Sequence, residues 1–147
     1  FRSIQMIRRR RKAKEGGKEE ENWKQKTTRK QKKQLNVIND QIGSPTYAAD
    51  LAQVILDIIN INHWKPGIYN YTNKAKISWY DLANDIKVIY GFNTIINPVT
   101  TEEYPTKAKR PKYSLLDKTK IKNTFNITLI PYKDSLKKCI KILKNET

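Results

Sequence analysis

The sequence predicts a mixed α/β fold in which helices alternate with short strands, and three observations lead to that prediction. Apolar residues recur with the 3.6-residue period of a helix in residues 51–59 and again near the end of the chain. Short apolar runs at residues 35–39, 67–72 and 94–99 are bounded by the Gly, Pro, Asn and Asp residues that usually end strands. The chain has no internal repeat, and its 147 residues correspond to one ordinary domain.

The first 34 residues differ in composition from the rest of the chain. They hold 14 of the 30 basic and four of the 14 acidic residues, so they carry +10 of the formal net charge of +16. This basic, low-complexity segment is predicted to be disordered, because it offers too little apolar surface for burial. Three interpretations stay open: a solvated tail, a basic arm for nucleic acid, and a purine-rich tract read out of frame. Residues 35–147 are the predicted folded part.

The folded part is expected to begin with a strand, a turn and a helix. Residues 35–39 (LNVIN) predict the strand, which ends at Asp40 and the Gly-Ser-Pro turn that starts at Gly43. Ser44 or Thr46 is expected to cap the helix that follows. The apolar stripe of that helix has the spacing i, i+3, i+4, i+7 and i+8, and consists of Leu51, Val54, Ile55, Ile58 and Ile59.

A second strand and helix are expected after the break at Pro66 and Gly67. The run GIYNYT, residues 67–72, is typical of a strand. The next run, SWYDLANDIKVIYGF, predicts a helix with a clear start and end. Ser78 and Asp81 have the spacing of a capping box, and Gly91 favours a C-terminal stop.

The last third of the chain is expected to contain a strand, a loop and two helices. TIINPV, residues 94–99, predicts the strand, and residues 100–113 form a loop interrupted by prolines. Asp117 is expected to start a short helix. The run YKDSLKKCIKIL predicts the final helix, and its inward face would hold Leu136, Cys139, Ile140 and Leu143.

The predicted strands are too few and too short to cover these helices. We therefore expect the helices at residues 51–59 and 82–89 to keep an apolar patch, which leaves self-association or a homodimer open. The single cysteine, Cys139, excludes an internal disulfide and a multi-cysteine metal site, and it favours a reducing, cytoplasmic compartment. No apolar run approaches the roughly 20 residues of a membrane span.

Five segments together carry a resemblance to a known enzyme family. They are VINDQIGSPTYAADLA, GIYNYTN, SWYDLA, NPVTTEEYPTKAKRPKYSLLDKTKI and SLKKCIKIL. In order and spacing they resemble the C-terminal part of the dTDP-4-dehydrorhamnose reductases, which are extended short-chain dehydrogenases. The resemblance implies that residues 35–147 are the sugar-nucleotide (substrate) binding lobe of such a fold. It also implies a dTDP-sugar nucleotide as partner, and NADPH as the family's cofactor for reducing dTDP-4-dehydro-L-rhamnose to dTDP-L-rhamnose.

The sequence departs from this family in the parts that hold the cofactor and perform the reduction. It has no Gly-x-x-Gly-x-x-Gly turn, and none of its eight tyrosines is followed by a lysine four residues later. We therefore predict no catalytic, cofactor-binding or metal-binding residue, and we leave enzymatic activity of this chain open. The first residue is Phe1, and a fragment of a reductase or a truncated, non-functional product is one expectation.

The resemblance points to five candidate substrate-binding residues. Arg110 is the main one, because a guanidinium suits bidentate contact with a diphosphate. Gln41 and Thr46 flank the Gly43 turn and are candidates for hydrogen bonds to the sugar or base, although turn formation or helix capping would also explain them. Tyr113 and Ser114 follow Arg110 and are candidates for lining the pocket.

The sequence also contains residues that look functional but have simpler explanations. Asp50 is explained as a first-turn acid of its helix, and a lone His63 in a loop is usually exposed. The adjacent Glu102 and Glu103 point apart on an extended chain, and Cys139 belongs to an apolar stripe. The alternative to a sugar-nucleotide lobe is a small nucleic-acid-binding protein that uses residues 8–33 as a basic arm.

Overall fold

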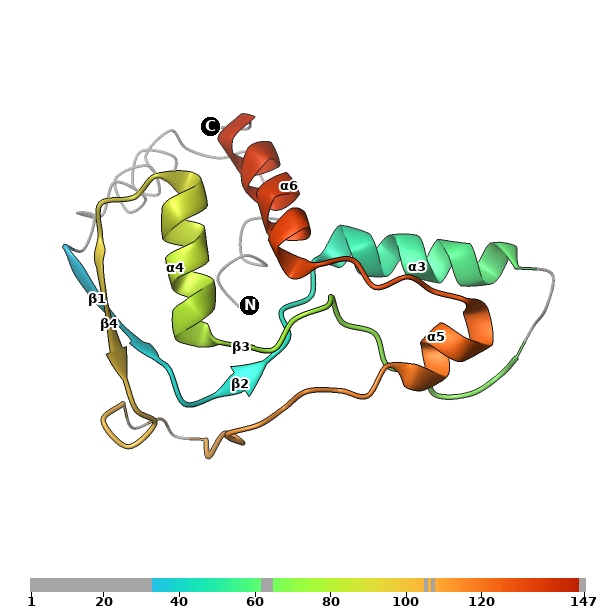
Figure 1. The fold of residues 1–147 in the computed structure, drawn as a ribbon, viewed down its shortest axis with the longest axis horizontal. Helices are drawn as coiled ribbons and strands as arrows, with labels where there is room; N and C mark the ends of the chain where they lie inside the picture. Colours follow the sequence, from blue (N-terminus) through green and yellow to red (C-terminus); the bar gives the residue numbers. More distant parts are fainter. Residues whose placement is uncertain (1–32, 62–64, 105, 107, 146–147) are drawn as a thin grey trace, which may run out of the picture. The chain divides into compact units, whose positions relative to one another are not determined.

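A computed structural model describes residues 33–61, 65–104, 106 and 108–145 (Figure 1). These residues belong to one unit, Lys33–Thr147, and only this unit is considered below. The boundary between a basic segment and a lobe at residue 35 stays a prediction, and almost all of the basic segment lies outside the described residues. His63 lies outside them as well.

The unit contains four helices and four short strands within the described residues, as a mixed α/β fold should. In chain order they are β1 (Gln34–Ile38), β2 (Ile42–Gly43), α3 (Ala48–Asn60), β3 (Ile77–Ser78), α4 (Trp79–Tyr90), β4 (Ile95–Val99), α5 (Thr119–Phe125) and α6 (Tyr132–Asn145). β1 pairs in parallel with β4, and β2 pairs antiparallel with β3. The predicted mixed fold is therefore confirmed.

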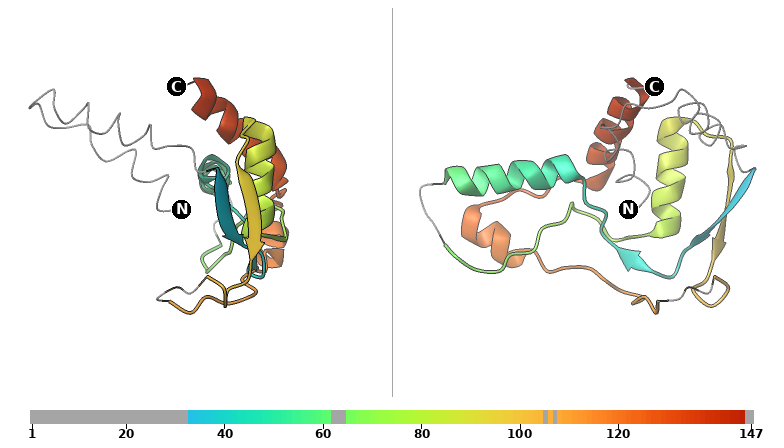
Figure 2. Two further views of the ribbon diagram at one scale, coloured as in Figure 1. Left: turned by 90° about the vertical axis from the view of Figure 1, so that its left-hand side faces the viewer. Right: turned by 180° about the vertical axis from the view of Figure 1, so that it is seen from behind.

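Helix α4 lies against the β1–β4 pair and also contacts α6 (Figure 2). Its start and end are those that the sequence predicts. The Ser78 hydroxyl accepts a hydrogen bond from the Asp81 backbone, and the Asp81 carboxylate accepts one from the Ser78 backbone, which completes the capping box. Gly91 ends the helix in the left-handed region at φ 90°. Tyr132 at the start of α6 donates a hydrogen bond to Asp85 of α4, and Lys133 forms an ion pair with the same carboxylate.

The apolar core lies beneath α3 and α5. Val54, Ile121, Phe125 and Ile127 are buried together, and Ile58, Ile61, Tyr69 and Tyr71 pack around them. Val54 is the only residue of the predicted α3 stripe that is fully buried. Leu51, Ile55 and Ile59 are exposed by 37%, 48% and 62%. The predicted apolar patch on α3 is therefore confirmed, and α4 contains no fully buried residue.

Four local predictions are wrong, because each depends on contacts with other segments that the local pattern does not show. GIYNYT forms no strand, because only Lys74 after it makes a single bridge, to Pro131. Gly43 lies in strand β2 instead of a turn, since Ile77 pairs with it. α3 has Tyr47 as its N-cap without a side-chain cap from Ser44 or Thr46. In α6, Ile140 is buried, whereas Leu143 is 40% exposed.

Candidate functional site

The candidate site is built around Ile42, which pairs with a different segment on each side. On one side Ile42 pairs with Ser78 of β3. On the other side its N–H donates to the Lys112 carbonyl at 2.8 Å, and its carbonyl accepts from the Ser114 N–H at 2.9 Å. Two of the five segments that carry the family resemblance, the one around Ile42 and the one around residues 112–114, therefore lie side by side.

Gly43 allows this close approach. A Cβ atom at position 43 would lie 3.2 Å from the Ser114 hydroxyl oxygen, which is tighter than ordinary van der Waals contact. That hydroxyl also donates to the Ile42 carbonyl at 3.2 Å. A side chain at position 43 would push against the strand-like pairing that joins residues 112–114 to β2.

Asp40 and Gln41 are fixed to the segment that follows β4. The Asp40 carboxylate accepts from the Thr101 N–H at 3.0 Å and from the Thr101 hydroxyl at 2.6 Å. The Thr101 side chain is the main cause that lowers the pKa of Asp40. Gln41 is 7% exposed, and its Nε2 donates to the Thr101 hydroxyl oxygen at 3.1 Å. The structure thus gives Gln41 a role in holding the site together.

Arg110, Tyr113 and Ser114 are exposed on the other side of β2. No described residue forms a hydrogen bond or ion pair with the Arg110 guanidinium, and it is the only arginine from residue 33 onward. The Tyr113 side chain is 58% exposed, and the Lys76 ammonium nitrogen lies 5.5 Å from the centroid of its ring. Lys112 lies 4.0 Å from Asp40, a long ion pair between partly exposed groups. This edge therefore presents cations that suit an anionic ligand.

Thr46 sits half-exposed in the four-residue turn between β2 and α3. The turn is held from outside by Asn73, whose Oδ1 accepts from the Tyr47 N–H at 2.8 Å and whose carbonyl accepts from the Ser44 hydroxyl at 2.5 Å. Sequence reasoning missed Asn73. Its neighbours read as a strand, and nothing in the local pattern shows that its side chain faces another segment.

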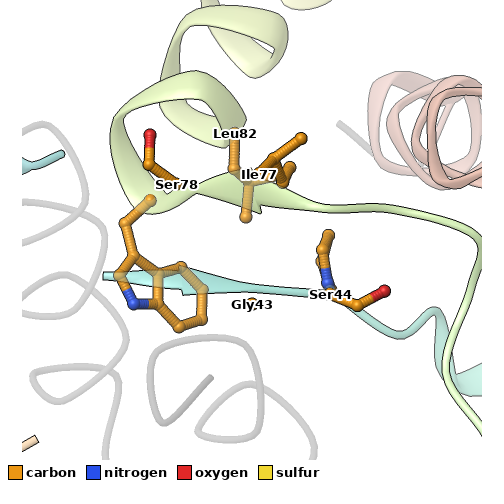
Figure 3. A pocket seen from close by; sticks show the side chains of 7 residues that line it. Gly43, Ser44, Ile77, Ser78 and Leu82 are labelled. Atoms are coloured by element: carbon orange, nitrogen blue, oxygen red, sulfur yellow. The ribbon is translucent and has the colours of Figure 1, made fainter. Parts of the chain in front are cut away.

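A small hollow adjoins this turn (Figure 3). It is lined by Gly43, Ser44 and Pro45, by Ile77 and Ser78, and by Trp79 and Leu82 at the start of α4. The two serine hydroxyls are already used, because Ser44 donates to Asn73 and Ser78 donates to Asp81. Among the other lining side chains only Trp79 carries a polar atom, its indole N–H, so the hollow offers few contacts to a polar ligand.

The remaining reactive-looking side chains have structural partners. Asp50 is 6% exposed and accepts hydrogen bonds from Asn73 and Ser135, so it is buried and does not face a cleft. The Glu103 carboxylate accepts from the Thr100 N–H at 2.7 Å, which lowers its pKa. Burial raises the pKa of the Cys139 thiol, which disfavours the reactive thiolate.

The described residues also form no metal centre and no bilayer-spanning element. Among them, no group of three or more His, Cys, Asp and Glu side chains is placed to hold a metal ion. In the same part of the chain, no helix is both long and apolar enough to cross a bilayer. The arrangement offers exposed cations along β2 and the segment paired with it, and these can bind an anion.

Three of the matches with known proteins describe what this chain is similar to. A dTDP-4-dehydrorhamnose reductase of Aggregatibacter actinomycetemcomitans is 41% identical over 114 residues, which are 70% of this chain and 38% of the relative. The solved dTDP-4-dehydrorhamnose reductase of Clostridium acetobutylicum matches with a TM-score of 0.71 at 35% identity, over 90% of this chain and 45% of that one. A reductase of Bacillus anthracis, solved in complex with NADP, matches with a TM-score of 0.64 at 33% identity, over 74% of this chain and 37% of that one.

The chain thus spans less than half the length of each of these proteins. The family model described as the RmlD substrate binding domain matches residues 16–145, which is most of the sequence. This match agrees with the fold and with the order of the motifs around Ile42 and Arg110. The chain therefore belongs to the RmlD substrate-binding domain family.

Proposed function

We propose that this chain is the sugar-nucleotide-binding portion of a dTDP-4-dehydrorhamnose reductase, and that its partner is a dTDP-sugar. The observation that carries the proposal is the pairing of Ile42 with residues 112–114. In this parallel pairing residues 112–114 lie along β2, with Arg110 toward the Asp40 end and Thr46 past the other end. The family match and the named reductase relatives support the same assignment.

Arg110 is the proposed contact to the diphosphate. Arg110 is exposed, and a ligand would not have to break an ion pair between its guanidinium and any described residue. Two N–H groups of a guanidinium can bind one phosphate, and Lys112 and Lys76 add positive charge at the same edge. Tyr113, Ser114 and Thr46 are the proposed contacts to the rest of the ligand. Gln41 mainly holds the site together through the hydrogen bond from its Nε2 to Thr101, and its Oε1 is the atom proposed to contact a ligand.

The cofactor of the proposed reductase is NADPH, in line with the NADP complex of the Bacillus anthracis relative. Dinucleotide sites use a glycine-rich turn between a parallel strand and a helix. The residues that follow β1 and β4 do not fit such a site. The Asn39 N–H donates to the Val99 carbonyl, and Asp40 is bound to Thr101, so these strand ends are bonded to each other. We therefore propose that the chain by itself binds the sugar nucleotide without reducing it. The proposed location of the chain is the cytoplasm.

The proposal is tested by titrating the full chain with dTDP-L-rhamnose and with dTDP in a calorimeter. Binding is expected, and Arg110→Ala should weaken it tenfold or more, because a lost charge-assisted contact costs about 1.5–3 kcal/mol. The affinity of Arg110→Lys should lie between those of the parent chain and Arg110→Ala, since lysine keeps the charge but lacks the planar guanidinium. Lys122→Ala, an exposed cation on α5, serves as the matched control and should bind like the parent.

Two outcomes would contradict the proposal. One is the absence of dTDP binding by the folded parent chain. If that chain then binds DNA in a salt-sensitive way, the basic arm is favoured. The other is equal dTDP affinity in the Arg110→Ala and Lys122→Ala variants. NADPH oxidation that depends on this chain and on dTDP-4-dehydro-L-rhamnose would overturn the statement that the chain does not catalyse reduction.

A further inference from the structure

Asn73 has no solvent exposure and makes hydrogen bonds to three separate parts of the chain. Its Nδ2 donates to the Asp50 carboxylate of α3 at 2.6 Å and to the Ser135 hydroxyl oxygen of α6 at 3.0 Å. A third, longer contact at 3.2 Å joins the same nitrogen to the Ile130 carbonyl. Ser135 in turn donates to Asp50. The orientation of the amide is fixed, because its oxygen faces an N–H and its nitrogen faces only acceptors.

The same residue holds both ends of the turn formed by residues 44–47. Its backbone carbonyl accepts from the Ser44 hydroxyl, and its side-chain oxygen accepts from the Tyr47 N–H. Helix α3 has no side-chain cap of its own at Tyr47. A residue 26 positions later in the sequence therefore accepts from the N-cap N–H, as the N3 side chain does in a capping box.

This turn carries Thr46, one of the candidate site residues. It follows β2 directly, and Thr46 lies between its two anchors. Hydrogen bonds to Asn73 thus fix the position of the turn, and hydrogen bonds to Asp50 and Ser135 fix the orientation of the Asn73 side chain. Buried polar groups in such a network are costly to leave unpaired, so the network favours one arrangement of the turn.

We propose that Asn73 is a positioning residue of the sugar-nucleotide site, which holds residues 44–47 and with them Thr46 in the binding arrangement. This inference rests on the proposed function. It requires an amide at position 73. A carboxylate there would place a second negative oxygen against Asp50 and the Ile130 carbonyl, where the structure has a donor.

The test measures dTDP affinity of the full chain and the hydrogen exchange of the Tyr47 amide, at a temperature where far-UV circular dichroism shows every variant folded. Asn73→Asp is expected to weaken binding tenfold or more and to speed exchange at Tyr47. Exchanging the two groups, with Asn73→Asp and Asp50→Asn together, restores one amide and one carboxylate. This double variant should recover most of the affinity.

Two further variants separate positioning from general stability. Ser135→Ala removes a partner of Asn73 on α6 without touching the turn, and it should weaken binding several-fold. It also serves as the test if Asn73→Asp does not fold. Phe125→Leu loosens the core under α5, and it should lower the melting temperature while leaving dTDP affinity and Tyr47 exchange unchanged.

The inference is overturned if folded Asn73→Asp or Ser135→Ala binds dTDP like the parent, or if Phe125→Leu weakens binding as much as they do. Failure of the parent chain itself to bind dTDP is a different result. It would contradict the proposed function, and the positioning role of Asn73 at that site would fall with it.

Discussion

Asp40 joins two segments that lie 61 residues apart, through two hydrogen bonds from Thr101. These bonds favour the charged carboxylate and lower its pKa from the usual 3.8. A carboxyl group whose pKa is lower in the folded state stabilises the fold above its unfolded pKa. That contribution is lost as the pH falls through the lower, folded value. The Asp40–Thr101 link should therefore weaken only below about pH 4.

Replacing Thr101 with Val tests this link. The change removes the donor hydroxyl and keeps the side-chain shape, so we expect the pKa of Asp40 to rise toward 3.8 in a carboxyl NMR titration. Asp117 is the internal control, because its pKa is lowered mainly by Thr119 and should not change. An unchanged Asp40 titration would show that the Thr101 hydroxyl does not stabilise the carboxylate.

Two buried tyrosine hydroxyls differ in whether they have a partner. The Tyr71 hydroxyl is buried, and none of the described residues forms a hydrogen bond with it. The Tyr132 hydroxyl donates to Asp85. The pKa of Tyr132 is raised mainly by burial and, to a lesser extent, by this hydrogen bond. Tyr71→Phe should be neutral or stabilising, whereas Tyr132→Phe should cost about 1.5–3 kcal/mol, as expected for a bond to a charged group. Urea unfolding of both variants checks this, and a larger loss for Tyr71→Phe would contradict it.

At the scale of single elements, α4 shows how far local sequence signals reach. Its capping box and its glycine stop involve residues within four positions of each other, so both could be predicted. Gly91→Ala should destabilise the chain by about 1–2 kcal/mol, because position 91 has φ 90°, which strains a residue with a Cβ atom. The added methyl group meets no neighbour, so the loss reports the backbone strain alone. Gly91→Asn should lose less, since Asn tolerates the left-handed region better. Equal stability of Gly91→Ala and the parent in urea unfolding would contradict this.

The elements that the sequence did not predict depend on partners distant in the chain. Residues 67–72 have the composition of a strand, yet no segment pairs with them there. Gly43 reads as a turn residue, but pairing of β2 with β3 on one side and with residues 112–114 on the other makes it extended. Propensity describes a residue's own preference, and strand formation needs a partner.

The candidate site divides in the same way. The motifs around Gln41 and Arg110 could be found in the sequence because they resemble a family, and the structure brings their segments together. Asn73 could not be found, because its importance comes from α3, α6 and the turn meeting at one buried side chain. Asp50 was explained by its own helix for the same reason. Its true partners lie 23 and 85 residues away.

At the scale of the whole unit, the apolar surface is divided unevenly. The core beneath α3 contains only four fully buried apolar side chains. Large apolar residues on the outer face of the same helix are exposed, with Leu56 at 53% and Ile59 at 62%. A contiguous apolar face on one helix commonly marks a surface that contacts another protein. Within the described part of the chain nothing covers these side chains, and the consequence open to measurement is association of the chain with itself.

We expect the chain to self-associate in a concentration-dependent way through the outer face of α3, because burying Ile55, Leu56 and Ile59 removes apolar surface from water. Sedimentation velocity over a range of concentrations measures this. Ile55→Lys together with Ile59→Glu should reduce association and leave the unfolding transition almost unchanged, since both side chains are already exposed. Val54→Ala is the matched control on the same helix. It should lower stability by about 1–3 kcal/mol through loss of core packing, without reducing association while the chain is folded. A parent chain that sediments as a monomer at every concentration would rule out this role for α3, and equal association in the double variant would place the contact elsewhere.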